Sequence, residues 1–293
     1  MNTTNTNKLS ARFAALQAPG VLLYAATLAG QLVAAFARGL IATITLEFIS
    51  WISGWPIPVE PIALAIAFGP LAVSLLCLLC PPLMAPINGR WWEMTTGGRP
   101  PEQDEQEAFD NAISELQEFD PNVRAPRHWF VAEEPGHNAA AYAASMRVDR
   151  GLLESPYAAA TIGHELGHLR TSDARLTSAL NLLLLMPMDT PEIRPLRTLP
   201  FRGLFWIASG QAVLWFFGNP WEMYWRTREF AADEYAARLG QGPALASSLE
   251  QTSLPYERSI QRMRFSRASH PYTKPRIAKL RAYQPDRTAG DQE

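Results

Sequence analysis

Two long stretches of this 293-residue chain carry no charged side chain, and they constrain its fold more than any other feature. The first covers residues 13–37 and continues, apolar apart from Arg38, to residue 46. The second covers residues 61–89. A helix needs about 20 predominantly apolar residues to cross the hydrocarbon core of a bilayer. We therefore predict two transmembrane helices, one over about residues 21–46 and one within residues 61–89.

Two further apolar runs lie later in the chain, at residues 176–188 and 203–221. The first is short for a full crossing. The second is long enough and carries Trp near both ends, as membrane-interface segments do. These runs predict either a membrane hairpin or a hairpin buried in a globular domain. The domain prediction is a two-helix membrane segment over residues 1–89, followed by a domain over residues 90–293 that the hairpin at about 176–221 interrupts.

Basic residues predict the orientation of the first two spans. Lys8 and Arg12 precede the first span, whereas the connecting segment at residues 53–60 has no Lys or Arg. Positively charged loops stay on the cytoplasmic side of a membrane. The N-terminus and the block that follows Arg90 are therefore predicted to face the cytoplasm.

Charge and motif content exclude some classes of partner. The 26 basic and 28 acidic residues give a net charge of -2, which argues against a nucleic-acid binder, because such proteins are normally basic. The sequence has no Gly-rich phosphate-binding loop, so we predict no nucleotide partner. Cys77 and Cys80 lie in an apolar run and predict no disulfide framework.

The polar block after the second span predicts a mixed helical and strand domain. Apolar residues recur at helical spacing within residues 101–120, which predicts an amphipathic helix that packs on a core or acts as a regulatory lid. Residues 127–134, 137–145 and 146–151 have the composition of short strands separated by turns.

The pattern His164-Glu165-Leu166-Gly167-His168 is the main chemical signal in the sequence. Ser155 and Pro156 are favourable residues for the start of a helix over this segment. Residues four apart share a helix face, so both imidazoles can bind one zinc ion. Glu165 is then placed to act as a general base and to pass the proton to the leaving amine.

A catalytic zinc usually has three protein ligands, and a second helical segment can supply the third. Glu229 and Asp233 are four residues apart in a segment typical of a helix. We predict that Glu229 is the third ligand and that Asp233 accepts the free N–H of a ligating histidine. Two apolar runs lie between His168 and Glu229. An even number of crossings would return Glu229 to the side of the membrane that holds the histidines.

Together these motifs resemble the HtpX-type membrane zinc metallopeptidases, a gluzincin family that also includes the CAAX prenyl endopeptidases. The resemblance rests on HELGH, the hydrophobic hairpin, REFAADEYAARLG and SHPYTKPRIAKL, and covers about residues 138–280 plus the two spans. It implies a mainly α protein, with polytopic membrane helices and a zincin-like α+β domain that holds one Zn²⁺ per chain. It also implies a multi-pass protein of the bacterial inner membrane, with lipid and protein or peptide substrates as partners.

The resemblance also implies further site residues. His270 and Arg276 match a late family motif near the active site and are candidates to stabilise the oxyanion. Asn138, Ala139 and Ala140 match the segment that forms an edge strand against the extended substrate backbone. The implied role is quality control of membrane or misfolded proteins.

Two other functions fit parts of the sequence. HELGHLRTSD is also similar to the BlaR-type sensor peptidases, which cleave a single regulator. However, the Cys-Asp that follows their third ligand is missing here, and so is an appended sensing domain. The other alternative is a catalytically silent membrane scaffold, against which the intact Glu165 argues.

Overall fold

The computed structural model describes residues 3–80, 93, 97–171, 173–183, 213–260 and 273–283. The chain divides into two compact units. The first comprises Met1–Met84 with Arg175–Trp221, and the second comprises Ala85–Ala174 with Glu222–Glu293. The domain limits inferred from the sequence remain a prediction.

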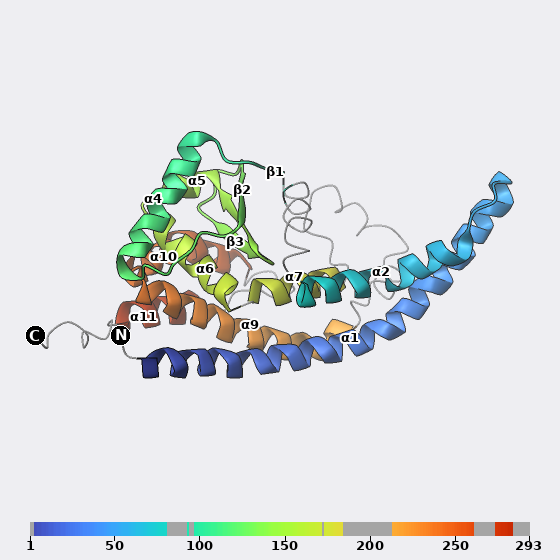
Figure 1. Cartoon of the computed structure of the whole chain (residues 1–293), viewed down its shortest axis with the longest axis horizontal. Coiled ribbons are helices and arrows are strands. Elements are labelled where there is room, and N and C mark those ends of the chain that lie inside the picture. Colours follow the sequence, from blue (N-terminus) through green and yellow to red (C-terminus); the bar gives the residue numbers. More distant parts are fainter. Residues whose placement is uncertain are drawn as a thin grey trace, which may run out of the picture. The chain divides into compact units, whose positions relative to one another are not determined.

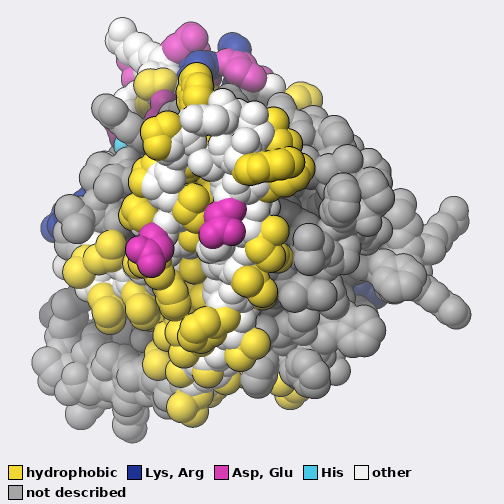
Figure 2. Space-filling model, turned by 90° about the vertical axis from the view of Figure 1, so that its right-hand side faces the viewer, with side chains coloured by type: hydrophobic (Ala, Val, Ile, Leu, Met, Phe, Trp, Pro, Cys, Tyr) yellow, Lys and Arg dark blue, Asp and Glu magenta, His cyan; other side chains and the backbone are white. Residues whose placement is uncertain are grey.

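Two long helices dominate the first unit (Figure 1): α1 (Thr3–Ser53) and α2 (Val59–Leu79). Pro19–Ser53 and Val59–Leu79 are both long and apolar enough to cross a membrane. Large hydrophobic side chains such as Leu22, Phe36 and Trp51 are exposed along α1. Hydrophobic side chains also cover much of the described surface in Figure 2. The prediction of two long apolar N-terminal helices is confirmed, although α1 extends beyond residues 21–46 at both ends.

Arg38, the one charged residue within the first predicted span, is buried against α2. Its guanidinium donates to the carbonyl of Ala67 at 2.9 and 3.2 Å and to the side chain of Gln31 at 3.1 Å. A charge inside a membrane helix is costly unless it faces the helix interface and finds polar partners. These contacts explain how α1 accommodates an arginine in the middle of an apolar run.

The later apolar runs are described only in part. Helix α7 (Asp173–Leu183) contains the start of the first run, and α9 (Val213–Arg238) contains the end of the second. Residues 184–212 lie outside the described part of the chain. Helix α9 continues without a break from the apolar run into the segment with Glu229. Whether this hairpin crosses the membrane stays a prediction.

A four-stranded sheet lies in the second unit, in the order β1-β2-β4-β3. Its strands are β1 (Gly98–Arg99), β2 (His128–Ala132), β3 (Ala139–Tyr142) and β4 (Ser145–Asp149). Strands β2 and β4 are parallel, and the other two pairs are antiparallel. The three predicted strands are confirmed. The two-residue β1 is too short to leave a pattern in the sequence. Strand β3 is an edge strand.

The turn between β3 and β4 contains a strained residue. Tyr142 pairs with Ser145, so Ala143 and Ala144 form a two-residue turn, and Ala143 has a φ of 53°. A left-handed conformation costs an L-residue about 1–2 kcal/mol, which glycine avoids. We expect Ala143→Gly to stabilise the protein by roughly 1 kcal/mol and to raise its melting temperature. Ala144→Gly is the matched control and should lower it. A fall with Ala143→Gly would contradict this account.

Helices cover the sheet and hold the core of the second unit. They are α4 (Gln103–Phe119), α5 (Arg150–Leu153), α6 (Ala158–Arg170), α10 (Gly242–Ile260) and α11 (Thr273–Ala282), together with the C-terminal part of α9. Helix α6 contacts both β3 and α4, and α10 contacts α6 and α11. The predicted amphipathic helix is confirmed as α4, whose apolar face is buried in a core with β4, α6 and α9, through Phe109, Ala112, Ile113 and Leu116. The lid alternative for α4 is therefore not supported.

The helix that carries the His164 motif begins later than the sequence indicated. We expected Ser155 and Pro156 to start it, but α6 begins at Ala158. The carbonyl of Ser155 accepts the N–H of Ala158 at 3.2 Å, and its hydroxyl accepts the N–H of Tyr157 at 3.2 Å. These bonds close a separate turn first, so the helical ladder starts two residues later than Pro156.

Candidate metal centre

Helix α6 presents the two histidines of the motif side by side. The rings of His164 and His168 have centroids 4.9 Å apart and lie nearly perpendicular to each other. His164 is buried and His168 is half-buried. This arrangement follows from their i,i+4 spacing on one turn of the helix.

Glu229 on α9 reaches both imidazoles. Its Oε2 lies 3.6 Å from His164 Nε2, and its Oε1 lies 3.4 Å from His168 Nε2. Ligand atoms of these three residues all lie within 4.8 Å of one another. Ligands about 2.0–2.2 Å from a zinc ion in a tetrahedral site are roughly 3.3–3.6 Å apart. The donor set and its spacing therefore fit one zinc ion, held by His164, His168 and Glu229 as the sequence predicted.

Gly167 allows α6 and α9 to approach closely enough for this geometry. A Cβ at Gly167 would lie 3.0 Å from Ala232 Cα and 3.2 Å from Ala232 Cβ. These atoms belong to the helix that carries Glu229, one turn away from it. The glycine in the middle of the motif is therefore a packing requirement that the sequence pattern alone does not explain.

We expect Gly167→Ala to separate α6 from α9, weaken zinc binding and cost about 1–3 kcal/mol of stability, as overpacking does. Gly163→Ala is the matched control on the same helix. A Cβ at Gly163 would lie 3.3 Å from the end of the Leu116 side chain and 3.8 Å from Ala236 Cβ, and a side-chain end can move aside more easily than the backbone of Ala232. Measurement of the zinc affinity and the melting temperature of both variants tests this prediction. Equal effects at the two positions would contradict the packing argument.

Asp233 lies behind His164, one helical turn beyond Glu229. Its Oδ1 is 3.0 Å from His164 Nδ1, on the side of the ring away from Glu229. Arg276 on α11 then binds Asp233 in a bidentate manner at 2.7 and 2.8 Å, and its third nitrogen lies 2.8 Å from Glu229 Oε2. The geometry thus matches the contact expected of Asp233, whose orienting role remains a prediction.

A second carboxylate lies behind His168, and sequence reasoning missed it. Asp173 Oδ2 is 3.6 Å from His168 Nδ1, and Arg228 Nε is 2.7 Å from both Asp173 oxygens. Asp173 is the last residue of HELGHLRTSD and Arg228 is the first residue of REFAADEYAARLG, but neither has a spacing that indicates a role. Only the fold brings α7 and α9 together at this point.

The charges around the site favour a divalent cation. Within the described part of the chain, the centre contains four carboxylates, on Glu165, Glu229, Asp233 and Asp173. Two guanidinium groups, those of Arg276 and Arg228, have described contacts with them. With neutral imidazoles these described groups have a formal charge of −2, which one Zn²⁺ would balance. An uncompensated charge is costly in a buried site, so this balance is a second reason why zinc fits.

The same carboxylates act on the imidazoles. Burial opposes protonation of His164, but Asp233 and Glu229 outweigh burial and raise the pKa of this imidazole. Burial likewise opposes protonation of His168, whereas Asp173 and Glu229 raise its pKa to about 10. Burial would raise the pKa of Asp233, but Arg276 and His164 lower it overall. This field attracts cations, and zinc would displace protons from the two rings when it binds.

Glu165 lies beside the ligands and is held by the edge strand. Its Oε1 is 4.0 Å from His164 Nε2, and its Oε2 accepts the backbone N–H of Ala141 at 2.8 Å. Ala141 was not among the predicted substrate-strand residues. Because backbone groups alternate along a strand, the N–H of Ala139 faces the same way as that of Ala141. The carbonyl of Asn138 instead accepts the N–H of Asp149 on β4 at 2.9 Å.

Of the remaining predicted site residues, the structure describes Arg276 but not His270. His270 lies outside the described residues. Arg276 is 3% exposed, and all three of its guanidinium nitrogens lie on the carboxylates of Asp233 and Glu229. Its role toward an oxyanion stays a prediction.

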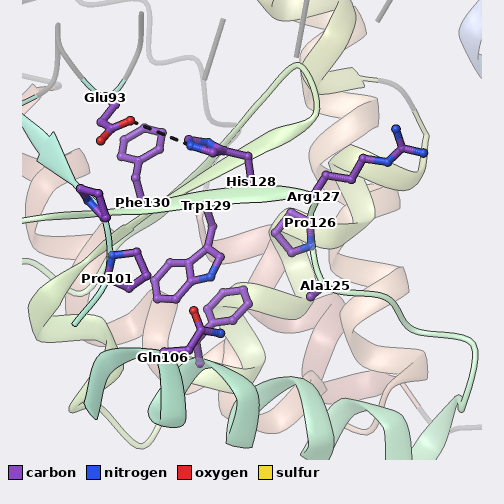
Figure 3. Close-up of a pocket in the computed structure, with 11 residues that line it drawn as sticks. Glu93, Pro101, Gln106, Ala125, Pro126, Arg127, His128, Trp129 and Phe130 are labelled. Atoms are coloured by element: carbon purple, nitrogen blue, oxygen red, sulfur yellow. Dashed lines mark ion pairs between the residues drawn. The ribbon is translucent and has the colours of Figure 1, made fainter. Parts of the chain in front are cut away.

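A separate cavity of about 450 Å³ lies beside β2 and α4, and no residue of the metal centre lines it. Figure 3 shows Trp129 between Pro101 and Gln106, with His128 directed towards Glu93. The last two side chains are 3.9 Å apart. The indole of Trp129 stacks on Phe109 with ring centroids 4.2 Å apart. This cavity is therefore distinct from the candidate metal centre.

Comparisons with known proteins agree with the geometry. The model of Peptidase family M48 matches residues 118–284, a little more than half of the chain. No curated protein and no solved structure gives a significant match. The matched segment contains α6, α9 and α11, and with them the complete His–His–Glu set. The resemblance to the HtpX-type peptidases is thus confirmed, and the chain belongs to Peptidase family M48 as a zinc metalloendopeptidase.

Proposed function

We propose that this protein is a membrane-bound endopeptidase that cleaves membrane or misfolded proteins on the cytoplasmic side of the bacterial inner membrane. The observation that carries the proposal is the position of Glu165, between the metal ligands and the edge strand β3. The two candidate spans support membrane attachment. The cytoplasmic orientation is supported by Lys8 and Arg12 before the first span.

The edge strand supports a broad choice of substrate. An extended peptide that adds to a sheet edge is bound mainly through backbone hydrogen bonds, which every sequence offers. At this edge β3 offers backbone groups and not side chains: the N–H of Ala141 faces the edge, whereas the side chain of Ala139 is buried in the core. Such a site needs an unfolded or extended segment, because folded proteins already use their backbone groups. This requirement fits quality control better than recognition of one folded regulator.

Each residue has a definite task in the proposed hydrolysis. Zinc held by His164, His168 and Glu229 would polarise the scissile carbonyl. Glu165 takes a proton from the attacking water as its oxygen bonds to the carbonyl carbon. As the C–N bond breaks, Glu165 returns this proton to the leaving nitrogen, so the carboxylate is regenerated. The Ala141 N–H fixes the direction of Glu165, and Arg276 holds Glu229 and Asp233 in place.

Cleavage of unfolded casein by the detergent-purified, zinc-loaded chain tests the proposal, with a stably folded protein as the comparison substrate. We expect casein to be cut at several positions and the folded protein to resist. Zinc binding without casein cleavage would overturn the quality-control function. That outcome would favour a sensor peptidase with one regulator as its substrate, or a silent scaffold.

The side of the membrane on which the second unit lies can be tested separately. Glu154 is an exposed residue of the second unit. A Glu154→Cys variant that lacks Cys77 and Cys80 can be labelled in cells with a thiol reagent that does not cross membranes. Labelling only after the inner membrane is permeabilised is the expected result. Labelling in intact spheroplasts would place the second unit outside the cytoplasm and contradict the proposal.

A further inference from the structure

Asp173 is the first residue of α7 and is 2% exposed, yet its carboxylate has partners on α9 and in the turn after α6. It accepts the hydroxyl of Thr171 at 2.6 Å and that of Tyr224 at 3.3 Å. Arg228, 0% exposed, approaches both of its oxygens at 2.7 Å. The fold therefore fixes this carboxylate firmly in a buried position.

The fixed carboxylate faces the ring nitrogen that His168 does not direct to Glu229. Nε2 of His168 is 3.4 Å from Glu229, and Nδ1 is 3.6 Å from Asp173. The same division holds at His164, where Nε2 is 3.6 Å from Glu229 and Nδ1 is 3.0 Å from Asp233. Each imidazole thus has a carboxylate on its far side, and each of these carboxylates has a buried arginine.

The two histidines therefore have equivalent surroundings built from different elements. Behind His164, Asp233 lies on α9 and Arg276 on α11. Behind His168, Asp173 lies on α7 and Arg228 on α9. A carboxylate on the second ring nitrogen holds the proton there, so that the other nitrogen keeps its lone pair for the metal. A buried carboxylate needs a compensating charge, which the arginine supplies.

We propose that Asp173 and Arg228 are a positioning pair for His168, which sets the tautomer and ring direction needed for zinc. The inference rests on the zinc site, and not on which proteins the enzyme cleaves. The 3.6 Å between His168 Nδ1 and Asp173 Oδ2 is longer than a hydrogen bond, and a shift of roughly 0.5 Å would bring the two atoms within hydrogen-bond distance. Thr171, whose backbone N–H donates to the carbonyl of Gly167 at 3.2 Å, ties the end of α6 to this carboxylate.

The competing explanation is that Asp173 only links the turn after α6 to α9. A purely structural link would affect stability but not the affinity for zinc. Asp149 provides a matched control, because it is also buried and contacts an arginine, Arg147, at 2.9 Å, but none of the metal ligands. Asp149→Asn therefore reports the cost of losing a buried Asp–Arg contact away from zinc.

The test compares Asp173→Asn with Asp149→Asn in the purified full-length protein, with zinc affinity measured by competition with a chelator. Loss of a residue that orients a ligand typically weakens metal binding about 10–100-fold. We expect Asp173→Asn to weaken zinc binding by this factor and Asp149→Asn to leave it unchanged. Unchanged affinity in Asp173→Asn, with a lowered melting temperature in both variants, would overturn the proposal.

If Asp173→Asn does not fold, Thr171→Val tests the same pair with less disturbance. It preserves the shape of the side chain and removes the hydrogen bond to Asp173. The expected result is a loss of zinc affinity of at most about tenfold, smaller than that from removal of the carboxylate. Unchanged affinity would count against the proposal. Since no substrate is involved, a failure to cleave casein would leave this result intact.

Discussion

Replacement of Glu165 by Gln is expected to reduce peptide hydrolysis by at least about 10²–10⁴-fold, while zinc remains bound. Gln keeps the shape of the side chain and can accept the Ala141 N–H, which Glu165 now accepts at 2.8 Å. It cannot take a proton from water at neutral pH. The ligands His164, His168 and Glu229 are unchanged, so zinc content should stay at one per chain.

The measurement is casein cleavage together with metal analysis of the same preparation. Glu154→Gln serves as the control, because this carboxylate is exposed and its ion pair with Arg150, at 3.9 Å, is long. It should behave like the unmodified protein. If Glu165→Gln cleaves casein at the original rate, either the activity comes from a contaminant or another group is the base.

Replacement of Glu229 by Gln should remove both zinc and activity. The change deletes the anionic ligand and leaves the positive charge of Arg276, now 2.8 Å from Glu229, facing the metal position. Its effect on zinc affinity should exceed the roughly 10–100-fold loss typical of residues that only orient a ligand. Zinc content after dialysis, measured beside the melting temperature, tests this.

Glu234→Gln is the matched control for Glu229→Gln. Glu234 lies on the same helix, is partly exposed and pairs with Arg238 one turn later at 2.5 Å. Exposed pairs of this kind contribute little to stability. The control should therefore retain zinc and activity. Full zinc occupancy in Glu229→Gln would show that another residue is the third ligand.

Of the two carboxylates that lie behind the metal-binding histidines, the sequence could suggest Asp233 but not Asp173. Asp233 follows Glu229 by one helical turn, so its position behind the ligands is a local property of α9. Asp173 lies 55 residues before Arg228, the buried arginine that pairs with it. No periodicity links two such positions, and their contact exists only because α7 and α9 meet.

The start of α6 shows a different limit. Ser155 and Pro156 are favourable at a helix start, yet Ser155 closes a turn of its own before the helix begins at Ala158. Local propensity indicated the helix correctly but placed its first residue too early. The small error has no effect on the site, because His164 and His168 keep their spacing.

The sequence by itself determined the parts of this protein that depend on local spacing. Uncharged runs of sufficient length predict the two long helices, and the i,i+4 spacing of His164 and His168 places both rings on one face. The tertiary structure decided everything that depends on contacts between distant segments. Gly167 packs on Ala232, Ala141 holds Glu165, and Arg228 meets Asp173. Such contacts arise from how helices and a sheet edge pack together, and spacing along one chain segment carries no record of them.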